Sequence, residues 1–180
     1  MKFLELTNKR QSTRAYLDKP VEREILDRCL AAARLAPSAC NSQPWKFIVV
    51  DKPQLKDKIA RETFSKSISF NKFALQAPVL VVIVSQRSKL SACIGGILKG
   101  TNFKLMDIGI AAEHFCLQAA EDGIATCMMG WFNARKIGTL LNLPRNQKAK
   151  LLISVGYGCS DEIRVKTRKD TKEMSCYISN

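Results

Sequence analysis

The segment Ala36-Pro-Ser-Ala-Cys-Asn-Ser-Gln-Pro-Trp-Lys-Phe47 joins a helix-periodic stretch to the first strongly apolar run of the chain. Pro37 should end the preceding helix, because proline lacks an N–H donor and restricts the residue before it. Hydrogen-bonding side chains then crowd into six positions, at Ser38, Asn41, Ser42 and Gln43. A loop held between a helix and a strand can direct such groups at a flat ligand. Taken alone, however, the segment is better explained as an ordinary helix-to-strand turn.

Apolar periodicity predicts the elements on either side of this loop. Ala77 to Val84 is dense in β-branched residues and too short for a typical helix, so it should be a central strand. The other predicted strands cover 46–50, 124–129 and 150–157. The predicted helices cover 2–9, 21–36, 53–66, 102–122 and 134–141, and the segment 86–100 is predicted as a loop or short helix.

Helices and strands alternate too irregularly for βαβ repeats, which favours an α+β fold over a doubly wound sheet. No Gly-x-Gly-x-x-Gly follows a predicted strand, so a Rossmann cofactor site is not expected. A chain of 180 residues is most simply one domain over 1–180.

The composition indicates a folded cytoplasmic protein. The beginning of the chain lacks the apolar stretch of a signal peptide, and the longest apolar run is too short to span a bilayer as a helix, so no membrane insertion is expected. The seven cysteines include no Cys-x-x-Cys pair and are expected as reduced thiols. His114 is the only histidine and is interpreted as structural, and no metal site is predicted.

The net charge of +13 should attract anions. Nucleic acid is one possible partner, but the basic residues are spread along the chain and no nucleic-acid-binding motif accompanies them. We therefore expect a basic surface that serves a phosphorylated cofactor, and no nucleic-acid partner.

Two short basic segments are candidates for that surface. In an extended conformation Arg10, Ser12 and Arg14 face one way, which suits a phosphate and a ring carbonyl. The alternative of equal weight is a solvated basic loop. The second segment contains Lys166, Arg168 and Lys169 in the tail.

These motifs together resemble the FMN-dependent nitroreductase family. The resemblance is carried by Pro-Ser-x-x-Asn-x-Gln-Pro-Trp-x-Phe at 37–47 and by Arg-x-Ser-x-Arg at 10–14, in the family's order and spacing. It extends to Phe70-Asn71, to the stretch from Gly123 to Phe132, and to Lys166-x-Arg168, and so covers nearly the whole chain.

The resemblance implies a homodimer with a mixed, mainly antiparallel central sheet flanked by helices, and with FMN at the subunit interface. By analogy, the FMN phosphate and part of the ring would be held by Arg10, Ser12, Arg14, Lys166 and Arg168. The ring would be lined by Pro37, Ser38, Asn41, Asn71, Met129 and Gly130, with Asn71 at the pyrimidine edge and the backbone of 129–130 near N5.

The implied function is hydride transfer from NADH or NADPH, through flavin N5, to an electron-poor small molecule such as a nitroaromatic or a quinone. No catalytic side chain is needed, because the flavin does the chemistry, and Arg14 is the candidate for tuning the reduced ring. A non-enzymatic FMN-binding or storage protein is the alternative. The span 86–100 is short compared with that of family members with defined nitroaromatic activity, so less of the chain is expected to cover the substrate. Met129 stands where some relatives have an acidic residue. The motifs do not distinguish this activity from that of a deiodinase or a flavin-fragmenting enzyme.

Overall fold

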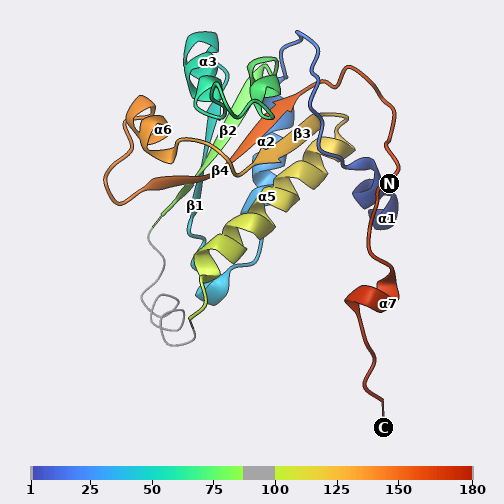
Figure 1. The fold of residues 1–180 in the computed structure, drawn as a ribbon. Helices are drawn as coiled ribbons and strands as arrows, with labels where there is room; N and C mark the ends of the chain where they lie inside the picture. The colour runs from blue at the N-terminus through green and yellow to red at the C-terminus, as the bar shows by residue number, and fades with distance from the viewer. Residues whose placement is uncertain (1, 87–99, 180) are drawn as a thin grey trace.

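The computed structural model describes residues 2–86 and 100–179, so most of the predicted loop or short helix at 86–100 lies outside the described residues. Its centre is a four-stranded antiparallel sheet in the order β1-β2-β4-β3 (Figure 1). The strands are β1 (Trp45–Val50), β2 (Val79–Ser85), β4 (Lys148–Gly156) and β3 (Ala125–Met129). The mainly antiparallel sheet of an α+β fold is therefore confirmed.

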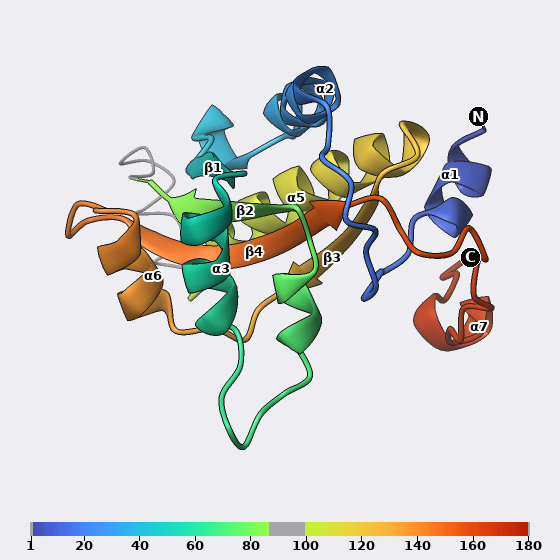
Figure 2. The same cartoon turned by 90° about the horizontal axis from the view of Figure 1, so that it is seen from above.

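Helices cover both faces of the sheet (Figure 2). On one face lie α2 (Arg23–Arg34) and α5 (Phe103–Glu121), which pack against the side chains of β2 and β4 that point to this face. On the other lie α3 (Pro53–Arg61), the 3-10 turn η2 (Lys72–Leu75) and α6 (Ala134–Leu140). The helix α1 (Phe3–Lys9), the 3-10 turn η1 (Ala39–Asn41) and α7 (Thr171–Met174) complete the described elements.

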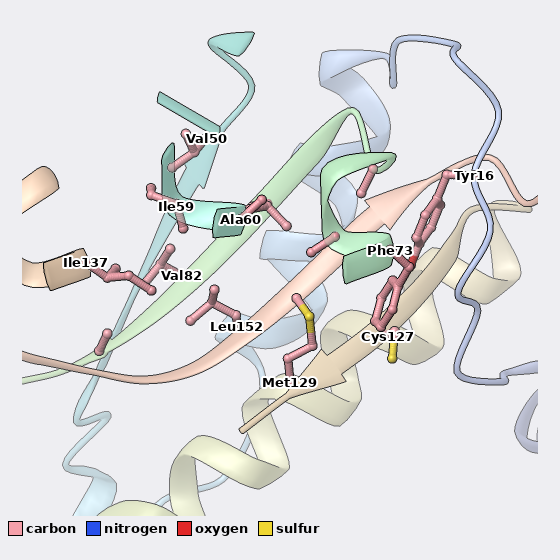
Figure 3. Close-up of a cluster of buried hydrophobic side chains, with 14 of the residues drawn as sticks. Tyr16, Val50, Ile59, Ala60, Phe73, Val82, Cys127, Met129, Ile137 and Leu152 are labelled. Carbon is pink, nitrogen blue, oxygen red and sulfur yellow. The ribbon is translucent and has the colours of Figure 1, made fainter. Parts of the chain in front are cut away.

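β2 is buried at every position because helices cover both of its faces and strands flank both of its edges. Its alternate residues divide between the two faces, Leu80 and Val82 toward α3 and α6, and Val81 and Ile83 toward α2 and α5. Figure 3 shows the first of these clusters, where Ile59, Ile137 and Leu152 meet Val82. Because both faces of β2 are buried, its sequence is a continuous apolar run, the pattern that predicted a central strand.

The long helix α5 begins at Asn102, whose side-chain oxygen accepts a hydrogen bond from Leu105 N. It ends before Gly123, which has φ +77° and takes the left-handed conformation that favours glycine. Its inner face is fully buried, but Leu105, Met106 and Ile110 leave 46%, 57% and 39% of their surface exposed. This helix therefore presents an apolar strip away from the sheet.

The predicted helices and strands are all present, with changed ends. α3 stops at Arg61 rather than at 66, because Glu62 and Thr63 turn the chain and Thr63 Oγ1 bonds back to Ala60 O at 2.7 Å. β4 begins at Lys148, two residues before its predicted start. α7 was not predicted, and a capping box between Asp170 and Glu173 explains it. Within the described ranges, no helix is long and apolar enough to cross a bilayer.

Candidate functional site

The segment that contains Arg10, Ser12 and Arg14 runs along the outer edge of β3. Thr13 N donates to Thr126 O at 2.9 Å, and Ser12 forms an isolated parallel bridge with Thr126. This pairing holds the segment extended against an edge strand, so the predicted geometry is present. The backbone of the segment is thus hydrogen-bonded to the sheet, while Arg14 is exposed to solvent.

Tyr16 anchors the end of this segment in the core (Figure 3). Its hydroxyl lies 2.7 Å from Ser154 Oγ and donates to Thr13 O at 2.8 Å, and the residue is 5% exposed. Gly156 permits this approach, because a Cβ there would lie 3.0 Å from Tyr16 Cδ1 and 2.6 Å from Pro78 Cδ. The tyrosine thereby fixes the backbone of residue 13, between Ser12 and Arg14.

The C-terminal arm, residues 159–170, returns to this segment. Lys166 and Arg168 line a pocket of about 320 Å³ together with Arg10, Ser12 and Arg14. The structure therefore brings together the two basic motifs, which lie more than 150 residues apart. Figure 1 shows the arm passing beside α1 and continuing to α7, away from the sheet.

Each cation in this pocket has a local contact that orients it. Arg10 Nε lies 3.1 Å from Glu113 Oε1 on α5. Lys166 Nζ donates to Thr7 O at 2.9 Å and to Asn8 O, two carbonyls in the last turn of α1. Burial lowers the pKa of Lys166, and the neighbouring Arg10 and Arg168 lower it further. A cluster of like charges of this kind favours an anionic ligand.

Two residues of this site were missed by the sequence analysis. Arg164 lines the same pocket, and its Nη2 donates to Ser12 O at 2.5 Å. Gln11 joins the arm to the segment, with its Nε2 donating to Glu162 O at 2.8 Å. The alternation of Arg164, Lys166 and Arg168 was the available signal, because it repeats the spacing at 10, 12 and 14.

A second group of predicted residues lies at the far end of β3. Asn71 is 5% exposed, and its Nδ2 donates to Trp131 O at 3.1 Å. The side chain of Met129 is buried in the core (Figure 3), so only its backbone can face a ligand. Gly130 is exposed, and a Cβ built there meets nothing within 4 Å.

Arg14 lies between the basic pocket and this second group. Its guanidinium carbon is 5.9 Å from the centre of the Phe73 ring, and Phe73 follows Asn71 by two residues in η2. The edge of β3 beyond Thr126 pairs with no strand in the described part of the chain. The arrangement is a strip that begins in a cationic pocket and continues along an open strand edge.

The predicted residues Pro37, Ser38 and Asn41 do not join this strip within the chain. Their loop packs on the N-terminal half of α5, where Ala39 N donates to Asp107 Oδ1 at 3.1 Å. Asp107 lies six residues before Glu113, the partner of Arg10, which is about 9 Å along the helix axis. None of the three residues lines the pocket that holds the cations.

The loop is strained and rigidly held. Cys40, Asn41 and Gln43 have φ values of 54°, 49° and 45°. Ser38 Oγ accepts from Gln43 N at 2.9 Å. Asp107 is buried, and its Oδ2 has no hydrogen-bond partner within residues 2–86 and 100–179. Such strain is often found where a backbone is shaped for a ligand.

Other kinds of site receive no support from the described ranges. No group of three or more His, Cys, Asp and Glu side chains there could hold a metal ion. His114 Nδ1 lies 3.3 Å from Ala32 O, between α5 and α2, which agrees with its structural interpretation. The cationic pocket of the strip suits a phosphate, and the open edge of β3 suits a flat group attached to it.

Comparison with known proteins agrees with this geometry. The family model described as "Nitroreductase family" matches residues 7–157. The chain is 29% identical over 178 residues to iodotyrosine deiodinase 1 of Sus scrofa, covering 86% of this chain but only 61% of the length of that protein. It is 30% identical over 190 residues to a Streptococcus pyogenes protein with the provisional name NAD(P)H nitroreductase Spy0809, covering 90% and 92% of the two chains.

Solved structures give the same result for the fold. The crystal structure of a nitroreductase family protein from Clostridium novyi NT has a TM-score of 0.78 and 32% identity, covering 88% of this chain and 87% of that one. The family model spans most of the chain and includes the segment 10–14 that lies along β3. The chain belongs to the nitroreductase family.

Proposed function

We propose that this member of the nitroreductase family is an FMN-dependent oxidoreductase. It would transfer hydride from NADH or NADPH to an electron-poor small molecule such as a nitroaromatic or a quinone. The observation that carries the proposal is the convergence of Arg10, Arg14, Lys166 and Arg168, joined by Arg164, on one pocket beside the open edge of β3.

The pocket suits the phosphate of FMN. Guanidinium groups bind phosphate through paired N–H donors, and Ser12 adds a hydroxyl in the same row. Glu113 keeps Arg10 in place across the segment. A dianionic phosphate would offset the mutual repulsion that lowers the pKa of Lys166.

The remainder of the strip suits the flavin ring. The edge of β3 offers backbone groups, and Gly130 leaves space beside them. Asn71 is held by its bond to Trp131 O, with its side-chain oxygen available to accept a hydrogen bond from a ring. Bound FMN supplies the redox chemistry, and the chain holds and orients it. In this proposal Arg14, which lies over the Phe73 ring, would supply a positive charge near the negative charge of the reduced ring.

The distant position of the loop 37–43 supports a homodimer. Within one chain this loop does not reach the basic pocket, although the family motif includes it in the cofactor site. The same region of α5 exposes an apolar strip of Leu105, Met106 and Ile110. A second copy packed on this strip would bury apolar surface and bring its own loop 37–43 to the cofactor.

The choice of reductant and acceptor rests on the relatives. The streptococcal relative's name supports NADH or NADPH as the reductant, and the family's name supports a nitro compound as one acceptor. The pig relative makes reductive deiodination of an iodotyrosine a second candidate activity, favoured by its 29% identity over most of this chain. A cofactor-storage protein without turnover is the non-enzymatic alternative.

The test begins with the visible spectrum of the purified protein. Non-covalently bound FMN should give a yellow protein that loses its absorbance when NADH or NADPH is added without oxygen. Adding a nitroaromatic, a quinone or an iodotyrosine then identifies the acceptor by recovery of the absorbance and by product analysis. A colourless protein that does not take up added FMN would refute the proposal, and a yellow protein without turnover would indicate storage.

A further inference from the structure

The side-chain amide of Gln11 makes hydrogen bonds to the C-terminal arm in the pattern of a backbone peptide group. Its Nε2 donates to Glu162 O at 2.8 Å, and its Oε1 accepts from Arg164 N at 3.2 Å. In a β-sheet, alternate residues of a strand use their backbone N–H as donor and C=O as acceptor toward the same neighbouring strand. The backbone of the segment 10–14 pairs with β3 on one side, and the side chain of Gln11 makes the corresponding hydrogen bonds to the arm on the other.

Arg164 returns the contact from the arm to the segment. Its Nη2 donates to Ser12 O at 2.5 Å, and its Nε donates to Gln11 Oε1 at 3.3 Å. A guanidinium has five N–H donors. The described contacts of Arg164 use only Nε and one N–H of Nη2, so other donors of this side chain can serve a ligand in the pocket that it lines.

This mutual contact, which we call the Gln11–Arg164 clasp, sets which arm residues face the segment. Side chains alternate along extended backbone. With Arg164 held at Ser12, Lys166 and Arg168 line the same pocket as Arg10 and Arg14, with Val165 and Thr167 between them. A shift of one residue along the arm would exchange the positions of these cations with those of Val165 and Thr167.

The arm has little other support at this point. Arg164 and Val165 are exposed, Val165 by 98%, so apolar burial does not fix their position. At the start of the arm, Cys159 N donates to Ala15 O at 3.2 Å. Beyond that point the described hydrogen bonds between the arm and residues 2–14 are those of the clasp and of Lys166 with the end of α1. Side-chain hydrogen bonds therefore hold the register of residues 162–166.

We propose that Gln11 is a positioning residue for the cofactor phosphate and that Arg164 is a further phosphate-binding residue. Gln11 occupies a variable position of the Arg-x-Ser-x-Arg motif, and Arg164 lies outside the motifs on which the family resemblance rests. The inference rests on the proposed function, because it takes FMN as the ligand. It adds that this chain distinguishes FMN from riboflavin partly through the clasp.

The test compares FMN with riboflavin, which has the same ring and no phosphate. Gln11→Met keeps the length of the side chain and removes its hydrogen bonds, and Arg164→Lys keeps the charge but removes the planar fork. Gln54→Met on the exposed face of α3 and Arg145→Lys in the loop before β4 are matched controls. Dissociation constants are measured by fluorescence titration of full-length apoprotein, and each variant's fold is checked by circular dichroism.

We expect FMN binding to weaken about threefold to tenfold in Gln11→Met and about tenfold in Arg164→Lys, in the range for losing hydrogen bonds to a charged group. Riboflavin binding should change by less than about twofold in both. A merely structural role would weaken both ligands equally, and that result would overturn the inference. So would variants that bind FMN like the two controls.

The failure of the proposed function gives a different result. If wild-type protein bound neither FMN nor riboflavin, both the function and the inference would be refuted. If the wild type bound FMN and turned over NADH or NADPH while the clasp variants kept its preference for FMN, the inference alone would fail. Tryptic cleavage after Lys166 and Arg168, slowed by inorganic phosphate in the wild type but less so in Gln11→Met, provides a readout that does not depend on turnover.

Discussion

Tyr16→Phe should cost more stability than the loss of one surface hydrogen bond, because the buried hydroxyl joins the segment that contains Thr13 to Ser154 on β4. It contacts Thr13 O at 2.8 Å and Ser154 Oγ at 2.7 Å in a site that is 5% exposed. Ser154 keeps a second contact, since its Oγ also donates to Cys127 O at 3.4 Å. Thr13 O loses the hydroxyl that it accepts from.

The size of the effect follows from these contacts. A net loss of about 1 kcal/mol for the hydrogen bond and about 1 kcal/mol for a partly buried acceptor left without a donor gives about 2 kcal/mol. For a chain of this length that corresponds to a fall in Tm of about 4–8 °C. Because residue 13 lies inside the segment that we propose binds the phosphate, the affinity for FMN should also fall.

Thermal unfolding of apoprotein, followed by circular dichroism, measures the change in stability. Tyr177→Phe is the matched control, because Tyr177 is 94% exposed. A double-mutant cycle with Ser154→Ala then isolates the coupling between the two hydroxyls. A Tm within about 1 °C of the wild type, against the fall expected above, would refute the role assigned to this hydroxyl.

Four further predictions address the cofactor site, the assembly and the buried thiols. Arg10→Ala and Arg168→Ala should each weaken FMN binding by about 1–3 kcal/mol, and unchanged affinity in both titrations would contradict the phosphate site. Arg14→Gln should lower the midpoint potential of the bound flavin, since it removes a cation near the reduced ring, and an unchanged potential would remove Arg14 from that role. Sedimentation of the holoprotein should give twice the chain mass, whereas a flavin-bound monomer at low micromolar concentration would exclude the obligate dimer. Burial raises the pKa of Cys29 and of Cys116 to about 12, so these thiols release their protons at lower pH in the unfolded chain than in the folded one. The free energy of unfolding should therefore fall as the pH rises above about 9. Between about pH 8 and about pH 10 the Tm of Cys116→Ala should fall less than the Tm of the wild type.

The helices and strands could be predicted because the spacing of their apolar residues indicates which faces are buried. β2 is apolar at every inward position on both faces, and α5 carries small and apolar residues around most of its girth. The predicted end of α3 was wrong because its stop depends on Thr63, whose hydroxyl bonds to a carbonyl one turn back. Polar side chains that bond locally end helices without the glycine or proline signal that sequence patterns provide.

The candidate site was predictable as motifs but not as an arrangement. The two basic segments were identified, yet their meeting depends on the arm returning to α1 beside β3. Gln11 and Tyr16 act through contacts with residues about 150 and 138 positions away, and no local pattern encodes such partners. Asp107 was not among the predicted site residues, and the structure buries it as the acceptor for Ala39 N.

The strained conformation of the loop at 37–43 suits the place that we propose for it, in a cofactor site completed by a second chain. Left-handed backbone costs a residue other than glycine about 1–2 kcal/mol, and Cys40, Asn41 and Gln43 all adopt it. Asp107 and Ser38 hold the loop in place through hydrogen bonds to backbone N–H groups, so contacts within the chain support the conformation. A loop fixed in this way loses little further entropy on binding. In a homodimer that brings the loop to the partner's basic pocket, this rigidity would direct its polar groups at the ring without a rearrangement, and the strain on one chain would then strengthen the cofactor site of the other.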